Sequence, residues 1–69
     1  MPRIHATADV AASAQIGEGA AIWHYAQVRE DCVIGENVIV GRGAYIGSGV
    51  HIGANSKIQN YAQIGRAHV

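Results

Sequence analysis

The chain of 69 residues has room for one small domain, and a chain of this length buries only about 60% of the surface that its unfolded form exposes. Lys and Arg together number five, as do Asp and Glu, so the formal net charge is zero. This balance excludes the basic surface of a nucleic-acid binder, and no apolar run approaches the roughly 20 residues that span a bilayer. We therefore expect neither nucleic acid nor a membrane as partner. Because the N-terminus lacks the features of a signal peptide, we expect a cytoplasmic address.

An aliphatic residue recurs at every sixth position of the chain, so the sequence divides into six-residue units, or hexads. Stepping by six from the first of them meets only Ile or Val: Ile4, Val10, Ile16, Ile22, Val28, Ile34, Val40, Ile46, Ile52, Ile58 and Ile64. Four residues after each of the first ten stands a small one, whereas His68 follows Ile64: the small residues are Ala8, Ala14, Ala20, Ala26, Cys32, Val38, Ala44, Val50, Ser56 and Ala62. A fixed period of this kind decides the architecture before local propensity does.

This period predicts an all-β parallel β-helix of about three and a half triangular coils. Each turn would hold three hexads, one short strand in each, with aliphatic and small side chains inside. The coils would span 4–21, 22–39 and 40–57, with a broken fourth from Ile58. Successive coils are expected about 4.8 Å apart and joined by parallel backbone hydrogen bonds. A six-residue period fits neither an amphipathic helix nor the strict alternation of a β-sandwich.

Glycine and cysteine add two further expectations. Glycine often follows the aliphatic residue directly, as at Gly17, Gly35, Gly41, Gly47, Gly53 and Gly65. We expect a corner there whose backbone conformation only glycine adopts at low cost. The single cysteine, Cys32, excludes an internal disulfide and a paired-thiolate zinc site, and we expect it to be buried as a small apolar side chain.

Polar residues at one hexad position supply a candidate site. His24, Arg42 and Asn60 are each separated by three hexads, which is one predicted coil, and should form a column at one corner. Such a column could bind a phosphate or carboxylate, or it could be merely solvated. The candidate substrate-binding residues are Tyr25, Arg42, Gln59 and Asn60.

His24 is the candidate general base, because an imidazole titrates near neutral pH and could take a proton from an attacking amine. A solvated or hydrogen-bonding role is the alternative. His5 and His68 lie near the chain ends, where we expect solvated side chains. His24 and His51 occupy different hexad positions, so a three-histidine zinc site would need residues from another subunit. We predict no metal site.

Aromatic residues at corner and outward positions need cover, since large exposed rings on a solenoid mark a partner surface or a ligand cleft. These residues are Trp23, Tyr25, Tyr45 and Tyr61. Two interpretations are open: another subunit or a further part of the chain covers these rings, or some of the rings line a ligand cleft.

Two short segments carry a resemblance to a known family. Ile22-Trp23-His24-Tyr25 and Lys57-Ile58-Gln59-Asn60, with the opening Ile4-His5-Ala6-Thr7-Ala8, resemble hexapeptide-repeat acyltransferases. The resemblance is to those that acetylate the 3-amino group of UDP-linked diamino-sugar uronates for bacterial surface polysaccharide. It covers residues 4–63 without gaps, although Arg42-Gly43-Ala44-Tyr45 stands where many members have Gln-Asn-Val-Phe.

That resemblance implies a left-handed helix and a homotrimer with active sites between adjacent prisms. It also implies acetyl-CoA as co-substrate, no permanently bound cofactor, and direct attack of the sugar amine on the thioester. The CoA-binding residues are expected downstream of residue 63.

The last six residues, 64–69, are what a common sequencing adapter read as ATC GGA AGA GCA CAC GTC would encode. We therefore expect residues 1–63 to be the N-terminal part of a hexapeptide-repeat domain and residues 64–69 to be a non-native tail that continues the last coil. The chain would then be an inactive fragment of an N-acetyltransferase. The alternatives are a non-catalytic structural or oligomerisation module and a hexapeptide acyltransferase with a different acceptor.

Overall fold

The computed structural model describes residues 1–65, which form short strands joined by tight turns. There are eleven two-residue strands in this range: β1 (Arg3–Ile4), β2 (Asp9–Val10), β3 (Gln15–Ile16), β4 (Ala21–Ile22), β5 (Gln27–Val28), β6 (Val33–Ile34), β7 (Ile39–Val40), β8 (Tyr45–Ile46), β9 (His51–Ile52), β10 (Lys57–Ile58) and β11 (Gln63–Ile64). Within residues 1–65 there is no helix of the length and apolarity needed to cross a membrane.

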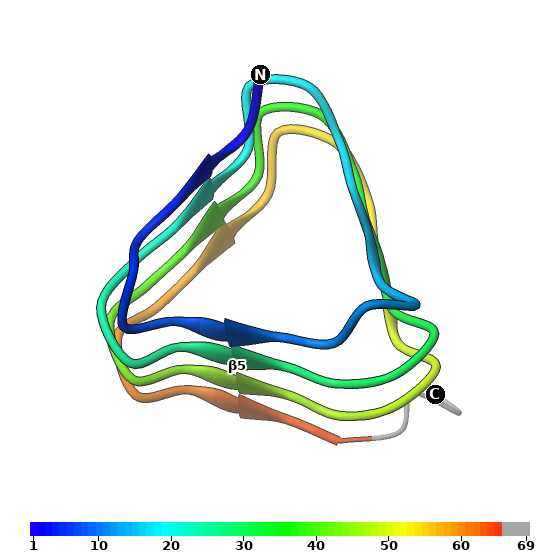
Figure 1. The fold of residues 1–69 in the computed structure, drawn as a ribbon. Coiled ribbons are helices and arrows are strands. Elements are labelled where there is room, and N and C mark those ends of the chain that lie inside the picture. The colour runs from blue at the N-terminus through cyan, green and yellow to red at the C-terminus, as the bar shows by residue number, and fades with distance from the viewer. Residues whose placement is uncertain (66–69) are drawn as a thin grey trace.

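Every third strand joins the same parallel sheet, so the chain forms a triangular prism (Figure 1). Sheet A has the order β1-β4-β7-β10, sheet B has β2-β5-β8-β11, and sheet C has β3-β6-β9. Arg3 pairs with Ala21 and Ile4 with Ile22, an offset of three hexads that recurs in every sheet. In Figure 1 the chain runs counterclockwise as it recedes from the N-terminus, which is a left-handed winding. The predicted left-handed parallel β-helix is confirmed.

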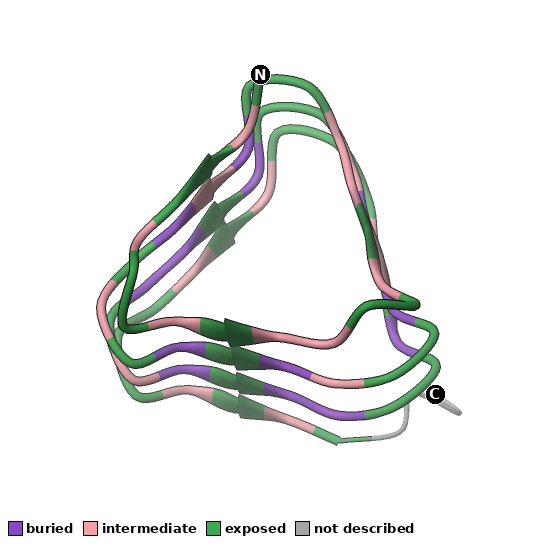
Figure 2. Ribbon diagram, in the orientation of Figure 1, coloured by how far each residue is buried: buried purple, intermediate pink, exposed green. Residues whose placement is uncertain are grey.

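The core is a stack of the aliphatic and small residues of the repeat, and it is complete only in the middle coils (Figure 2). Ile22, Ile34 and Ile46 are among the largest fully buried side chains. Ile4, in the first coil, is instead 45% exposed, because no coil covers it from the N-terminal side. Cys32 is buried as predicted, and its Sγ lies 2.9 Å from the carbonyl oxygen of Gly47.

The conformational prediction for the glycines that directly follow the aliphatic residues is wrong. None of Gly17, Gly35, Gly41, Gly47, Gly53 and Gly65 has a positive φ. Positive φ occurs instead two residues later, from Gly19 onward: at Gly19, Tyr25, Asp31, Asn37, Gly43, Gly49, Asn55 and Tyr61. These residues hold the third place of a β-turn, where a type II turn requires a left-handed residue.

Close stacking of the coils accounts for some of the glycines that follow the aliphatic residues. A Cβ atom on Gly35 would lie 2.7 Å from the backbone nitrogen of Ala54 in the next coil. A Cβ atom on Gly41 would lie equally close to the backbone nitrogen of Asn60. A side chain at these positions would therefore push the following coil away from its hydrogen-bonding distance.

Alanine substitutions at two glycines of one column test this explanation. We expect Gly35→Ala to lower the free energy of unfolding by about 1–3 kcal/mol, since backbone must move. Gly53→Ala is the matched control, because its Cβ atom would meet nothing within 4 Å and its φ is not positive. That variant should be neutral or gain about 0.4–1 kcal/mol. Urea unfolding followed by circular dichroism measures both, and equal effects would contradict the stacking argument.

Candidate active site at one corner of the prism

The corner between sheets A and B carries two of the three histidines of the described residues, His5 and His24, together with Arg42. We call it the A–B corner, and it consists of residues 5–8, 23–26, 41–44 and 59–62. None of these residues is acidic, whereas the turns at the other two corners include Glu18, Glu30 and Glu36. The A–B corner is therefore the one where cationic and aromatic groups gather without carboxylates.

Three rings stack across the first two coils at this corner. The ring centroids of His5 and His24 are 3.6 Å apart, with an interplanar angle of 40°. The indole of Trp23 is nearly parallel to the His24 ring, at 19°, with centroids 6.3 Å apart. His24 is half-buried, while Trp23 is 44% exposed. The register between coils brings His5 level with Trp23 and so beside His24.

A hydrogen-bond chain fixes the ring of His5. The backbone N–H of Thr7 donates to His5 Nδ1 at 3.2 Å, and the Thr7 hydroxyl oxygen lies 3.0 Å from the same nitrogen. That hydroxyl accepts the backbone N–H of Tyr25 at 3.0 Å, so its own proton can be donated to His5. A nitrogen that accepts these bonds carries no proton, and we assign the proton of neutral His5 to Nε2.

Arg42 connects the second, third and fourth coils. Its Nε donates to the hydroxyl oxygen of Tyr61 at 3.1 Å, and its guanidinium carbon lies 5.6 Å from the ring centroid of Tyr25. Its backbone N–H donates to the side-chain oxygen of Asn60 at 3.0 Å. Gly43 leaves the space that the ring of Tyr61 fills, since a Cβ atom there would lie 2.6 Å from two ring carbons. The guanidinium group is thus oriented by two tyrosines.

Both tyrosines hold a strained backbone conformation. Tyr25 has φ 60° and Tyr61 has φ 62°, in the left-handed region. The other non-glycine residues with positive φ are Asp31, Asn37 and Asn55, a residue class that tolerates this region. A left-handed residue other than glycine costs about 1–2 kcal/mol. Strain of this kind concentrates at functional sites, so these two rings are candidates for a functional role.

The pKa of His24 is lowered below its ordinary value. Desolvation by the surrounding side chains is the largest cause, and the coulombic interactions with His5 and with Arg42 add to it. The imidazole is therefore neutral at pH 7 and available to accept a proton. His24 thus has the protonation state that a general base needs.

The predicted column of His24, Arg42 and Asn60 is confirmed by the bonds between coils. The backbone N–H of Gly43 donates to the His24 carbonyl oxygen at 2.8 Å, and that of Tyr61 donates to the Arg42 carbonyl oxygen at 2.8 Å. Together with the Asn60 side chain, these bonds place the three predicted residues one above another.

The other predicted substrate-binding residues lie at the same corner. Tyr25 is 59% exposed beside Arg42, and Gln59 is exposed one residue before Asn60. Sequence reasoning missed His5, which it placed among solvated end groups. The structure shows His5 half-buried and stacked on His24. The signal that could have found it is the spacing of three hexads from His5 to Trp23.

The remaining histidines are not part of this site. His51 lies on β9 in sheet C, on a different face of the prism. His68 falls among residues 66–69, outside the described residues, as does most of the predicted non-native tail. Within residues 1–65, no three His, Cys, Asp or Glu side chains come close enough together to hold a metal ion.

Replacing His5 tests the electrostatic environment of His24. The His5→Gln substitution removes the coulombic interaction of residue 5 with His24, so the pKa of His24, measured from the pH dependence of its ring-proton NMR signals, should rise. His51→Gln is the control and should leave the pKa of His24 unchanged. No change in either variant would contradict the ring stacking.

The same pKa shift has a consequence for stability. Because the unfolded chain binds this proton more readily, the folded state should lose stability as the pH falls through the unfolded-state value of about 6.5. The loss is complete below the folded-state pKa of His24. Urea unfolding between pH 7.5 and 5 should show a shallower decline for His24→Gln than for the wild type; parallel curves would contradict the lowered pKa.

Two substitutions at Tyr25 test the left-handed turn. We expect the free energy of unfolding of Tyr25→Asn to lie within about 1 kcal/mol of the wild-type value. Relief of backbone strain should offset the loss of the cation–π contact with Arg42, which is worth about 0.5–1 kcal/mol. Tyr25→Val should be clearly less stable, since a β-branched residue is disfavoured at positive φ. Thermal unfolding measures both variants. Equal losses would mean that residue 25 is not left-handed in solution.

Comparison with known families adds one finding. The model of a family described as "Bacterial transferase hexapeptide (six repeats)" matches residues 13–48 and also residues 31–66. The two overlapping matches together span residues 13–66, well over half of the chain, and they contain most of the A–B corner. No curated protein matches the chain.

Proposed function

Because this chain belongs to the bacterial transferase hexapeptide family, we propose that it supplies the N-terminal coils of an acetyl-CoA-dependent N-acetyltransferase. The acceptor is the amine of a nucleotide-linked amino sugar, in the synthesis of bacterial surface polysaccharide. The observation that carries this proposal is the A–B corner, where a neutral imidazole lies beside an arginine held by two strained tyrosines. The identities proposed for the acceptor sugar and for the acetyl donor rest on the resemblance to sugar-nucleotide N-acetyltransferases.

In the proposed reaction, His24 acts on the attacking amine. The amine nitrogen attacks the thioester carbonyl carbon, a C–N bond forms, the C–S bond breaks, and CoA leaves as the thiolate. The nitrogen loses a proton, which the neutral imidazole of His24 accepts. The rings of His5 and Trp23 both lie against that of His24, which limits the positions the base can take.

Arg42, Tyr25 and Tyr61 position the acceptor in this scheme. The Arg42 guanidinium makes a hydrogen bond to a phenol oxygen and has no carboxylate partner within the described residues. It can therefore bind an anionic group such as a sugar carboxylate or a phosphate. Asn60 and Gln59 lie one coil further along and can add hydrogen bonds to sugar hydroxyls.

Further copies of the chain would cover the exposed rings of this corner. Tyr25 and Tyr61 are 59% and 66% exposed, and rings of this size exposed together mark a partner surface. We propose the homotrimer that the resemblance implies, with the A–B corner at the interface between prisms.

Acetyl transfer tests the proposed function. The source DNA is first sequenced again across codon 63, and the protein that it encodes is produced. This protein is incubated with acetyl-CoA and a panel of amino-sugar nucleotides, and the release of free CoA thiol is measured. We expect transfer to at least one amine and a loss of about 100-fold in kcat for His24→Gln. His51→Gln, on another face, is the control and should keep its activity.

Three results would count against parts of this proposal. If no acceptor is acetylated, the transferase proposal fails, and a structural or oligomerisation module becomes the proposed role of the chain. Transfer to an amine other than an amino sugar would keep the transferase and replace the acceptor. A small effect of His24→Gln on kcat would make His24 a positioning residue and not the base.

A further inference from the structure

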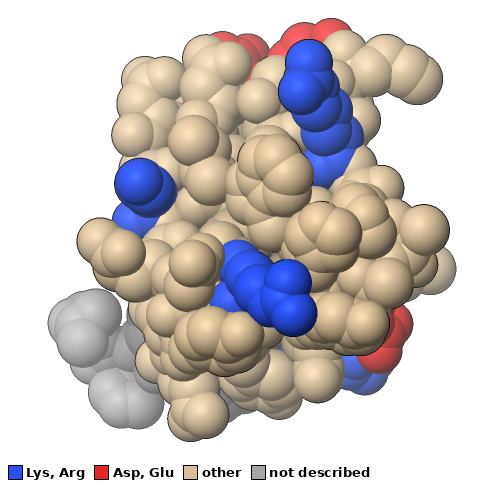
Figure 3. Space-filling view, turned by 90° about the vertical axis from the view of Figure 1, so that its left-hand side faces the viewer, with Lys and Arg blue, Asp and Glu red and all other residues tan. Residues whose placement is uncertain are grey.

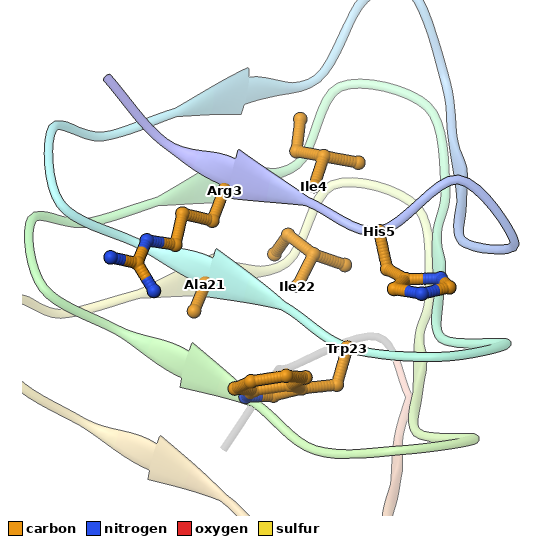
Figure 4. Close-up of a pocket in the computed structure, with 6 residues that line it drawn as sticks. All are labelled: Arg3, Ile4, His5, Ala21, Ile22 and Trp23. Atoms are coloured by element: carbon orange, nitrogen blue, oxygen red, sulfur yellow. The ribbon is translucent and has the colours of Figure 1, made fainter.

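A recess lies on the face of sheet A, beside the corner just described. It has a volume of about 260 Å³ and is lined by Arg3, Ile4 and His5 of the first coil and by Ala21, Ile22 and Trp23 of the second. Figure 4 shows the short side chain of Ala21 lying between the Arg3 guanidinium and the Trp23 indole, which reaches back along its own strand. The recess exists because an alanine stands between two large side chains.

The charges around this recess are unbalanced. Sheet A presents Arg3, Ala21, Ile39 and Lys57 at register-paired positions, and none of these residues is acidic. The ion pairs of residues 1–65 join the N-terminus to Glu18 and Arg29 to Asp9 and Glu30, so they use neither Arg3 nor Lys57. Figure 3 shows basic groups spread over this face, with the acidic ones confined to its margins.

The lining therefore combines a flat aromatic face, a free guanidinium and an apolar floor. An indole face stacks on planar rings, and a guanidinium pairs with phosphate oxygens. The volume is somewhat below the roughly 300 Å³ at which ordinary small-molecule pockets begin, so it suits one ring and not a whole ligand. Strands in a sheet are about 4.8 Å apart, so a phosphate on Arg3 and a ring above Ala21 lie within one nucleotide's reach.

We propose that this recess binds a nucleotide, with its base against Trp23 above Ala21 and its phosphate on Arg3. The inference rests on the proposed function, because both proposed substrates contain a nucleotide. These substrates are the nucleotide-linked amino sugar, which accepts the acetyl group, and acetyl-CoA, which donates it. The recess shares His5 and Trp23 with the A–B corner, and the rings of both residues stack on that of His24. In this orientation the base lies next to the A–B corner, and the phosphate lies on the far side of Ala21 from that corner.

Binding can be followed without any reaction, because Trp23 is the only tryptophan in the chain. Uridine diphosphate, adenosine 3′,5′-diphosphate and inorganic pyrophosphate are titrated separately, with tryptophan fluorescence and calorimetry as readouts. We expect a nucleotide to quench Trp23 and pyrophosphate to bind at least tenfold more weakly. Whichever base binds more tightly identifies the source, the sugar nucleotide or acetyl-CoA.

Two pairs of variants locate the site. Ala21→Leu fills the recess and Arg3→Gln removes the guanidinium, and each should weaken nucleotide binding by about tenfold or more. The matched controls are Gln15→Leu, at the same strand position on sheet C, and Arg29→Gln, an arginine already paired with carboxylates. Both controls should stay within twofold of the wild type. Circular dichroism confirms that each variant is folded, and Arg3→Gln, at an exposed position, keeps the test valid if Ala21→Leu unfolds.

Several outcomes would overturn the inference. Pyrophosphate binding as tightly as the nucleotides would remove the role of the ring, and equal losses in Arg3→Gln and Arg29→Gln would reduce binding to net charge. If neither nucleotide binds at millimolar concentration, the inference is also overturned. Acetyl transfer with an unchanged KM in Ala21→Leu would sink this site alone, whereas specific nucleotide binding without any transfer would sink only the proposed reaction.

Discussion

The parallel backbone hydrogen bonds between successive coils hold every other feature in place. They set an offset of three hexads that is the same in all three sheets. Each residue of an inner coil therefore has a counterpart directly above and directly below it. The inward columns form the core, and the outward columns bring together residues that lie far apart in the sequence. His5 and His24 meet only because their coils are bonded in this register.

The same register explains where the fold is strong and where it is weak. A solenoid is stabilised by contacts between neighbouring repeats, so a coil with neighbours on both sides buries more than one with a single neighbour. Ile34 is fully buried between two coils, whereas Ile4 has a coil on one side only. The A–B corner extends from the weakly covered first coil to the fourth, and Arg42 in the third coil bonds to residues of the fourth.

The architecture could be predicted from the sequence because a six-residue period has few physical solutions. The coil boundaries, the inward columns and the alignment of His24, Arg42 and Asn60 all followed from counting. Turn geometry did not follow, because a period says which residue stands at a corner but not which dihedral angle it adopts. The glycines were therefore assigned to strained backbone, while positive φ falls at Tyr25 and Tyr61.

The chemistry of the site was only partly predictable for a related reason. The column of polar residues could be counted, but contacts between neighbouring columns depend on how side chains turn. The stacking of His5 on His24 and the bond from Arg42 to Tyr61 are contacts of this second kind. The recess beside Ala21 also depends on the direction of the Trp23 ring, which no spacing reveals.

The most direct test of this account is a nuclear Overhauser spectrum of the chain in solution, because everything depends on the register between coils. The account predicts strong cross-peaks between the ring protons of His5 and His24, whose centroids lie 3.6 Å apart, and between the side chains of Arg42 and Tyr61. Absence of these cross-peaks in a folded chain, or contacts displaced by one residue, would contradict it.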